Sequence, residues 1–167
     1  MSRILLIFLA ITLACSVAEA NTLQTFDAIC KQTIDKSFCS GILAKATSPS
    51  MKDLLKVTVT EAEIRSADTY SFIFSMILIN GGSEASLKKC LEIYTIVNAS
   101  FTNAVSLFNY EQYAEIIPHM DEVSYAVGIC KTDFKVPGYN INPMIKKNKE
   151  TNVLAAMEKI IGHMLSS

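Results

Sequence analysis

The sequence is poor in the residues and motifs from which most active sites are built. It has only two histidines in 167 residues, His119 and His163. It contains no G-x-S-x-G elbow, no phosphate-binding glycine loop and no H-E-x-x-H pair. The paired E-x-x-H motifs of di-iron helical bundles are also missing. We therefore expect no catalytic residue and no cofactor, and we predict that the protein is not an enzyme.

The chain also lacks an excess of charge of either sign. Fifteen lysines and arginines face sixteen aspartates and glutamates, which gives a net charge of −1. A nucleic-acid-binding protein presents a basic patch to phosphates, and recruitment to an anionic membrane surface needs a polybasic segment. The balance of charge predicts no nucleic-acid partner and no charge-driven membrane binding.

The apolar run at the start of the chain is too short to cross a bilayer comfortably. It covers residues 4–17, follows Arg3 and is followed by Ala18-Glu19-Ala20. A basic start, a short apolar core and an A-x-A end are typical of a secretory signal peptide. We predict a signal peptide over residues 1–20 and a secreted mature chain without a membrane anchor; a retained signal anchor is the alternative.

Four cysteines follow the predicted cleavage site, namely Cys30, Cys39, Cys90 and Cys130. An even number in a secreted chain predicts two disulfides, for which three pairings exist. We favour the local pairs, Cys30 with Cys39 and Cys90 with Cys130. The second pair is symmetric about Tyr110, so an antiparallel helical hairpin that turns there would bring the two cysteines level. No C-x-x-C pair or accompanying histidine supports zinc, and we expect no metal.

Apolar residues recur at helical spacing along the whole mature chain, which predicts an all-α fold. Helices are predicted over residues 22–33, 37–46, 51–80, 83–108 and 113–134, and from Asn142-Pro143 to the end. We expect a kink or a late helix start at Pro118, and a core face on the last helix that includes Met164. The sum is an N-terminal helical hairpin (residues 21–48) and an up-and-down four-helix bundle (residues 49–167).

Two features leave alternatives open. Residues 72–79 are apolar on nearly every side, so they are either enclosed by the bundle, which we favour, or present a sticky flank. Asn98-Ala99-Ser100 is the only N-glycosylation sequon. At 100° per residue Asn98 falls within the apolar stripe of its helix, so a buried or half-buried asparagine is favoured over a glycan.

Several fragments, in their order and spacing, resemble the plant invertase and pectin methylesterase inhibitors. They are Cys30-Lys31-Gln32-Thr33 leading to Phe38-Cys39, Cys90 with Tyr94, Cys130-Lys131-Thr132-Asp133-Phe134, and Asn142-Pro143-Met144-Ile145-Lys146-Lys147-Asn148. The resemblance covers essentially the whole mature chain. It implies a four-helix bundle with the disulfide pairing given above. It also implies a protein that docks on a carbohydrate enzyme of the cell wall, apoplast or vacuole and blocks its cleft.

One position departs from this resemblance. Where invertase inhibitors present a P-K-F motif, at the start of the third bundle helix, this chain has Glu111-Gln112-Tyr113. We take these three residues as candidate target contacts. Without the lysine they favour pectin methylesterase as the protein target, with invertase inhibition and a non-inhibitory binding module as alternatives. Many members of this family carry a fifth cysteine in the last helix, where this chain has Leu154-Ala155-Ala156. A dimer linked through that cysteine is therefore not expected, and we predict a monomer.

Overall fold

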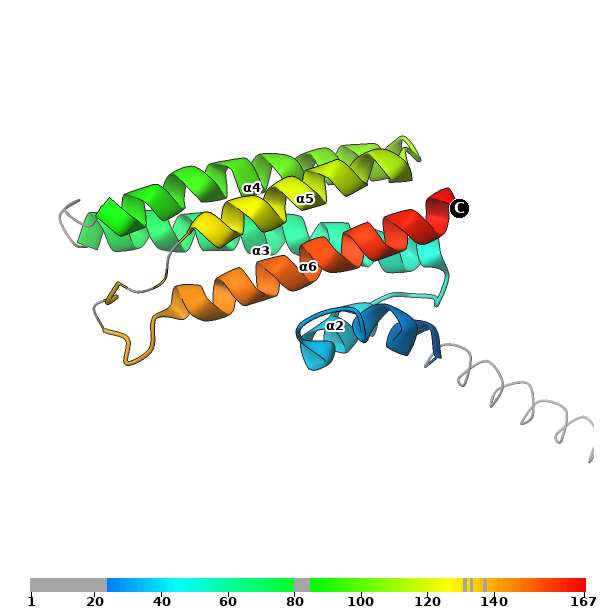
Figure 1. Cartoon of the computed structure of the whole chain (residues 1–167), viewed down its shortest axis with the longest axis horizontal. Coiled ribbons are helices and arrows are strands. Elements are labelled where there is room, and N and C mark those ends of the chain that lie inside the picture. Colours follow the sequence, from blue (N-terminus) through cyan, green and yellow to red (C-terminus); the bar gives the residue numbers. More distant parts are fainter. Residues whose placement is uncertain (1–23, 80–84, 131, 133, 137) are drawn as a thin grey trace, which may run out of the picture.

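The computed structural model describes residues 24–79, 85–130, 132, 134–136 and 138–167, and within these residues it contains helices and loops but no strand. Residues 24–30 are helical. They are followed by α2 (Lys36–Leu43), α3 (Met51–Ile79), α4 (Ala85–Asn109), α5 (Tyr113–Ile129) and α6 (Pro143–Ser166), as Figure 1 shows. The all-α prediction is confirmed. The predicted signal peptide and Ser83, the first residue of the helix predicted over residues 83–108, lie outside the described residues.

The four long helices form a bundle in which each helix lies beside two others. In chain order α3 packs on α4, α4 on α5 and α5 on α6, and α6 returns to α3 (Figure 1). Contacts between α3 and α6 join Arg65 to Glu150 and Phe72 to Lys147, so the residue numbers rise on one helix as they fall on the other. These two helices are therefore antiparallel, and Figure 1 shows the same alternation around the bundle.

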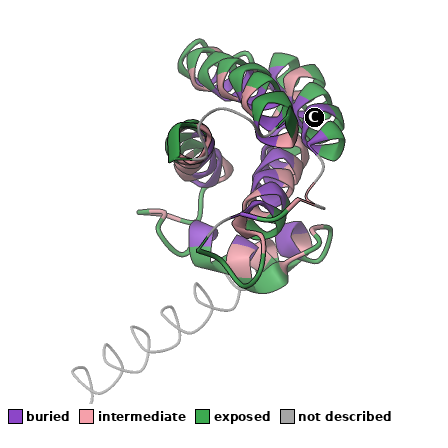
Figure 2. Cartoon of the chain, turned by 90° about the vertical axis from the view of Figure 1, so that its left-hand side faces the viewer, coloured by how far each residue is buried: buried purple, intermediate pink, exposed green. Residues whose placement is uncertain are grey.

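The apolar stripe predicted for α4 is the face that the helix buries. Its buried side chains recur every three or four residues, and they are Leu87, Cys90, Ile93, Tyr94, Val97, Ser100, Phe101, Ala104 and Phe108. Figure 2 shows buried residues on the inward sides of the helices and exposed residues outside. Full burial of one large aliphatic or aromatic side chain stabilises the fold by about 1.5–3 kcal/mol, so this periodic burial holds the bundle together.

The favoured prediction for residues 72–79 is wrong. Of this segment only Ile73 is wholly buried, whereas Leu78 and Ile79 are 65% and 70% exposed and Phe74 is also exposed. The physical reason is the placement of α2, which lies under the half of the bundle where α3 begins (Figure 1). In the part of the chain that the structure describes, no helix covers the outer face of the other end of α3, so its apolar side chains form the sticky flank that was the alternative.

Helix α5 runs through Pro118, with five helical residues before it, so a late start at the proline is wrong. A proline at this position leaves the carbonyl of Ala114, four residues earlier, without its helical donor. Ala114 and Pro118 are both exposed, so water can reach that carbonyl.

Helix α6 begins as predicted, with Asn142 as its N-cap and Pro143 at its first turn. The Asn142 side chain accepts a hydrogen bond from the Met144 amide, and proline is well tolerated there because its missing N–H has no helical acceptor. Met144, Val153, Leu154, Met157 and Ile161 are buried as expected. Met164 is 40% exposed, contrary to the prediction, because it lies in the last turn of the helix.

Candidate functional site

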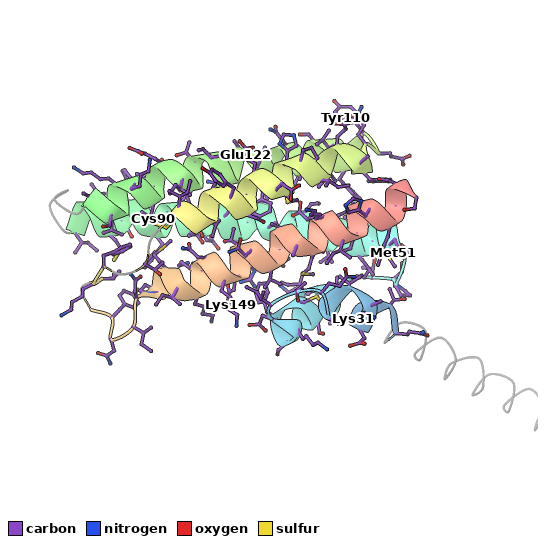
Figure 3. All side chains as sticks on the ribbon, in the orientation of Figure 1. Lys31, Met51, Cys90, Tyr110, Glu122 and Lys149 are labelled. Atoms are coloured by element: carbon purple, nitrogen blue, oxygen red, sulfur yellow. A yellow bond between two sulfur atoms is a disulfide. The ribbon has the colours of Figure 1, made fainter. Side chains whose placement is uncertain are left out.

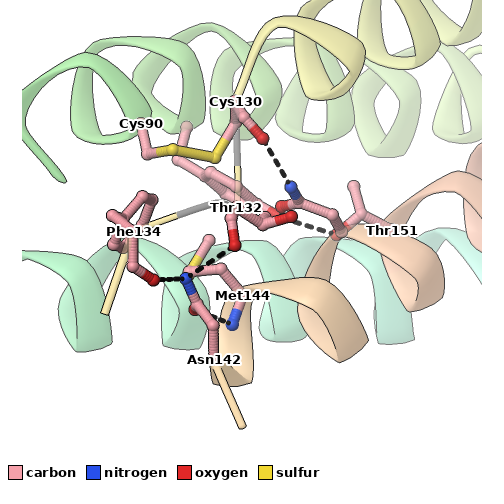
Figure 4. The surroundings of a disulfide bond; sticks show 9 residues. Cys90, Cys130, Thr132, Phe134, Asn142, Met144 and Thr151 are labelled. Carbon is pink, nitrogen blue, oxygen red and sulfur yellow. Dashed lines mark hydrogen bonds between the residues drawn. A yellow bond between two sulfur atoms is a disulfide. The ribbon is translucent and has the colours of Figure 1, made fainter. Parts of the chain in front are cut away.

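A disulfide and a buried polar network join α4, α5 and α6 at one end of the bundle, as Figure 4 shows. Cys90 is bonded to Cys130, and the Cys130 carbonyl accepts a hydrogen bond from the Asn148 side chain at 3.0 Å. The Tyr94 hydroxyl donates to Asn148 Oδ1 at 2.9 Å and lies 3.1 Å from Thr151 Oγ1. Burial raises the pKa of the Tyr94 phenol, so the hydroxyl keeps its proton and remains a donor.

The loop between α5 and α6 is attached to the same joint through Asn142. The Asn142 amide donates to the carbonyls of Thr132 and Phe134, at 3.2 and 2.7 Å, while its Oδ1 caps α6 (Figure 4). One side chain therefore satisfies groups of both the loop and the helix. Several residues of the fragments that carried the family resemblance meet at this joint, and their role is structural. They are Cys90, Tyr94, Cys130, Phe134 and Asn142.

The N-terminal hairpin is closed by the predicted Cys30–Cys39 disulfide and is docked on α3 and α6 through ionic and aromatic contacts. The Lys149 ammonium lies 2.7 Å from a carboxylate oxygen of Asp35, the N-cap of α2. The hydrogen bond from Lys149 lowers the pKa of Asp35, as does the bond from the Phe38 amide. The Arg65 guanidinium stacks over the Phe38 ring at 5.1 Å. These contacts attach the hairpin to two helices of the bundle.

A cleft of about 720 Å³ separates the starts of α2 and α6. Its charged lining consists of Asp35, Lys146, Lys149 and Glu150. Lys149 pairs with Asp35, and Lys146 lies 3.6 Å from Glu150. Because the charges are matched within the cleft, it offers neither an acid–base pair nor a concentrated field for a charged ligand.

The predicted contact residues Glu111, Gln112 and Tyr113 lie at the turn between α4 and α5, at the far end of the bundle from the Cys90–Cys130 disulfide. Glu111 has a positive φ of 58°, which the turn requires, and it pairs with Lys52 of α3 at 2.5 Å. This hydrogen bond lowers the pKa of Glu111. Tyr113 is half-buried against the Phe108 ring.

The start of α5 approaches α6 closely at Gly162. A Cβ at this position would lie 3.1 Å from the Tyr113 carbonyl oxygen, so glycine permits the contact. A shallow cleft of about 340 Å³ separates the turn from the end of α6, and its lining includes Glu111, Gln112, Tyr113 and Glu115. The structure thus places the three predicted residues together on an accessible surface. Their contact with a target stays a prediction.

Asn98 is half-buried, in agreement with the sequence-based preference, and its Oδ1 is enclosed without a hydrogen-bond partner among the described residues. Ser100, the third position of the sequon, is buried, and its hydroxyl donates to Glu122 at 2.9 Å. The sequon is therefore helical and packed on its α5 side.

We expect the folded protein, when secreted from plant cells, to carry no glycan at Asn98, because a glycan would have to leave from a side chain that is half enclosed. The intact mass should equal that of the mature polypeptide with two disulfides and no glycan, and it should not change on glycosidase treatment. An Asn98→Gln variant, which cannot be glycosylated, is the control. A mass excess in the wild type that this variant lacks would contradict the prediction.

Sequence reasoning missed the one fully buried carboxyl group of the described chain, Glu158 on α6. Neither carboxyl oxygen has a hydrogen-bond partner in the described residues. Burial raises its pKa well above the usual range. The sequence signal that could have revealed the burial of Glu158 was its helical spacing. It lies four residues after Leu154 and three before Ile161, both of which are buried.

The described residues contain no group of three or more histidine, cysteine or acidic side chains that could hold a metal ion. Among the helices of the described residues, none has the length and hydropathy needed to cross a membrane. What the described residues do offer is a helical bundle and an N-terminal hairpin, each closed by one disulfide, with the turn between α4 and α5 exposed.

Comparison with known proteins agrees with this architecture. The family profile described as plant invertase/pectin methylesterase inhibitor matches residues 24–166. A solved structure described as mutant form A of a pectin methylesterase inhibitor from Arabidopsis superposes with a TM-score of 0.70 at 19% identity, covering 83% of this chain and 95% of that chain. Another pectin methylesterase inhibitor structure, from Arabidopsis thaliana, gives 0.61 at 20% identity, with 84% and 95% covered. No curated protein matches the chain significantly.

Proposed function

We propose, since the chain belongs to the plant invertase/pectin methylesterase inhibitor family, that it is a secreted inhibitor that docks on a pectin methylesterase and occludes its cleft. The preference for pectin methylesterase over invertase as the target rests on the turn between α4 and α5. Gln112 stands where invertase inhibitors present a lysine, and the neighbouring Glu111 is a carboxylate held by Lys52. The solved structures that share the fold are described as pectin methylesterase inhibitors, which supports the same choice.

The architecture supports a binding role because the surface is formed before any partner arrives. Disulfides Cys30–Cys39 and Cys90–Cys130 tie the hairpin and the bundle, so little ordering is needed on association, and a preorganised surface loses less free energy on binding. The disulfides also fit an oxidising compartment. Together with the predicted signal peptide they support secretion to the apoplast, where such a target would be met.

Invertase inhibition is the second candidate, and the same turn argues against it. A glycosidase cleft contains a pair of catalytic carboxyl groups. Because the hydrogen bond from Lys52 lowers the pKa of Glu111, this residue stays ionised at mildly acidic pH. An acidic cleft repels an ionised carboxylate, and Lys52 is already paired with Glu111, so it does not replace the lysine of the invertase-inhibitor motif.

The test is inhibition by the purified mature protein, residues 21–167, of several plant pectin methylesterases at mildly acidic and neutral pH. We expect saturable loss of esterase activity with at least one of them, and no loss of sucrose hydrolysis by cell-wall or vacuolar invertase. Protein reduced and alkylated at its four cysteines is the control for a fold-dependent effect. Full activity of every esterase at saturating inhibitor would refute the proposal.

A further inference from the structure

Basic residues gather in the loop before α6 and in the first two turns of this helix. From Phe134 to Lys149 the sequence holds four lysines and no acidic residue. The lysines are Lys135, Lys146, Lys147 and Lys149. The chain as a whole is nearly balanced, with a net charge of −1, so this segment carries a local excess of positive charge.

Two of these lysines have a carboxylate nearby. The Lys149 ammonium pairs with Asp35 at 2.7 Å. Lys146 lies 3.6 Å from Glu150, which also accepts a hydrogen bond from Arg65 at 3.3 Å. Because two cations share the carboxylate of Glu150, the positive charge of this region is only partly neutralised.

The other two lysines form no ion pair within the described residues. Lys135 is exposed in the loop. The Lys147 ammonium lies 5.0 Å from the centre of the Phe72 ring of α3, a cation–π contact. Asp68, one turn before Phe72 on α3, lines a cleft of about 70 Å³ together with Lys147 but is not paired with it. The surface where the loop and α6 meet α3 is therefore cationic.

An exposed aromatic ring belongs to the same surface. The Tyr139 ring meets the Phe72 ring edge to face, with centroids 5.9 Å apart, and Tyr139 is 49% exposed. Its amide donates to the Val136 carbonyl at 3.1 Å, which fixes the turn that carries the ring. Residues 69–79 of α3 contain no acidic or basic side chain. We call this surface the basic platform and define it by Phe72, Lys135, Tyr139, Lys146 and Lys147.

We propose that the basic platform binds a linear polyuronate, the de-esterified form of pectin. The choice of this polyanion rests on the proposed function, since a pectin methylesterase produces it. Each uronate unit has a carboxylate, which an ammonium group attracts, and a sugar ring whose C–H groups can pack on an aromatic face. The platform offers both kinds of contact. Because every unit repeats them, weak contacts add along the polymer.

The platform leaves the candidate target contacts free. Figure 3 labels Lys149 in the first half of α6 and Tyr110 at the α4–α5 turn, at the opposite end of the bundle. Glu111, Gln112 and Tyr113 belong to that turn and to the start of α5. One inhibitor molecule can therefore hold the polymer at one end and an enzyme at the other, which would keep it where the enzyme acts.

Binding of the mature protein to immobilised polygalacturonate, measured without any esterase, tests the platform. We expect binding that weakens as salt is added, because exposed charges are screened, and no binding to the same polymer after full methyl esterification. Polyglutamate has the carboxylates without the sugar rings, and vesicles of anionic phospholipid have the charge on a membrane. Both should bind more weakly than polygalacturonate.

Two adjacent pairs of lysines provide matched variants. Lys146→Gln/Lys147→Gln and Lys88→Gln/Lys89→Gln each remove the fourth and fifth residues of a helix, α6 or α4, that starts at this end of the bundle. In each pair one lysine has a glutamate nearby. We expect the first variant to bind polygalacturonate about tenfold more weakly, as for two exposed charge contacts. The second should stay within twofold of the wild type.

Two exposed tyrosines test the aromatic contact in the same way. Tyr139→Ala removes the ring of the platform, and Tyr110→Ala removes one that is 76% exposed at the α4–α5 turn. We expect Tyr139→Ala to weaken binding to polygalacturonate about fivefold without changing the weak binding to polyglutamate, and Tyr110→Ala to change neither. Thermal unfolding verifies that each variant is folded.

The outcomes separate the platform from the proposed function. A wild-type protein that does not bind polygalacturonate, or that binds it no better than Lys146→Gln/Lys147→Gln does, would overturn the platform even if it inhibits an esterase. Equal or tighter binding to polyglutamate, or to the vesicles, would also overturn it, in favour of attraction to charge alone or to a membrane. A wild-type protein that binds polygalacturonate but inhibits no pectin methylesterase would support the platform and overturn the proposed function.

Discussion

Replacing Glu158 with methionine should stabilise the protein, and the gain should grow as the pH rises. Methionine has a similar length and no polar atom, so it removes a buried carboxyl group that has no hydrogen-bond partner in the described residues. Leaving such a group unsatisfied costs about 1–3 kcal/mol, which is the gain expected at pH 4, where the carboxyl is mostly protonated in both folded and unfolded chains.

The pH dependence follows from the direction of the pKa shift. Burial raises the pKa of Glu158 in the folded protein well above its ordinary value in an unfolded chain. Between these two pKa values the folded chain holds a proton that the unfolded chain releases, so folding becomes less favourable as the pH rises. The destabilisation caused by Glu158 is thus smallest at acidic pH and grows toward neutral pH.

Urea unfolding of the wild type and of Glu158→Met at pH 4 and pH 7.5 measures both effects. Glu158→Gln is the matched control, because it keeps a buried polar group but cannot ionise. It should lose the pH-dependent contribution of this residue without the full gain of the methionine variant. Equal differences between wild type and Glu158→Met at the two pH values would show that Glu158 does not titrate as proposed.

Removing the Cys90–Cys130 disulfide should produce the largest loss of stability among the changes considered. The bridge closes a sequence separation of 40 residues, and loop-closure entropy predicts a loss of about 4 kcal/mol for a loop of this size. Its removal also loosens the carbonyl of Cys130 that accepts the hydrogen bond from Asn148, so the joint between α4, α5 and α6 loses two constraints together.

The measurement compares Cys90→Ala/Cys130→Ala with Cys30→Ala/Cys39→Ala, which removes the bridge of separation 9. The second double variant should lose about 3 kcal/mol by the same arithmetic, with the change confined to the N-terminal hairpin in hydrogen exchange. The first should increase exchange at the ends of α4, α5 and α6 near the joint. A smaller loss for Cys90→Ala/Cys130→Ala than for the other pair would contradict the loop-length argument.

Much of the architecture could be predicted because local signals agreed with one another. The turn at Asn109-Tyr110, the start of α6 at Asn142-Pro143 and both disulfides follow from spacing, capping chemistry and chain symmetry. Pro118 shows the limit of such signals. A proline disfavours a helix locally, but the helix continues through it because the residues on both sides pack on the bundle and the orphaned carbonyl is on the exposed side.

The candidate site was less predictable, because exposure depends on neighbouring helices. Tyr125 and Phe101 both fit helical spacing, yet Tyr125 is 74% exposed and Phe101 is 1% exposed. The same limit applies to Glu111, whose pairing with Lys52 joins residues that are 59 positions apart. No local sequence pattern predicts the exposure of Tyr125 or the pairing of Glu111 with Lys52.

The sequence by itself determined the helices, their order, the pairing of Cys30 with Cys39 and of Cys90 with Cys130, and the resemblance to a family of inhibitors. These follow from interactions between residues near in the chain, or from symmetry about one turn. Only the tertiary structure decided that Glu158 is buried, that Leu78 and Ile79 at the end of α3 are exposed and that Tyr125 on α5 is exposed. Burial and charge pairing arise between helices, so they are defined only when the helices have packed.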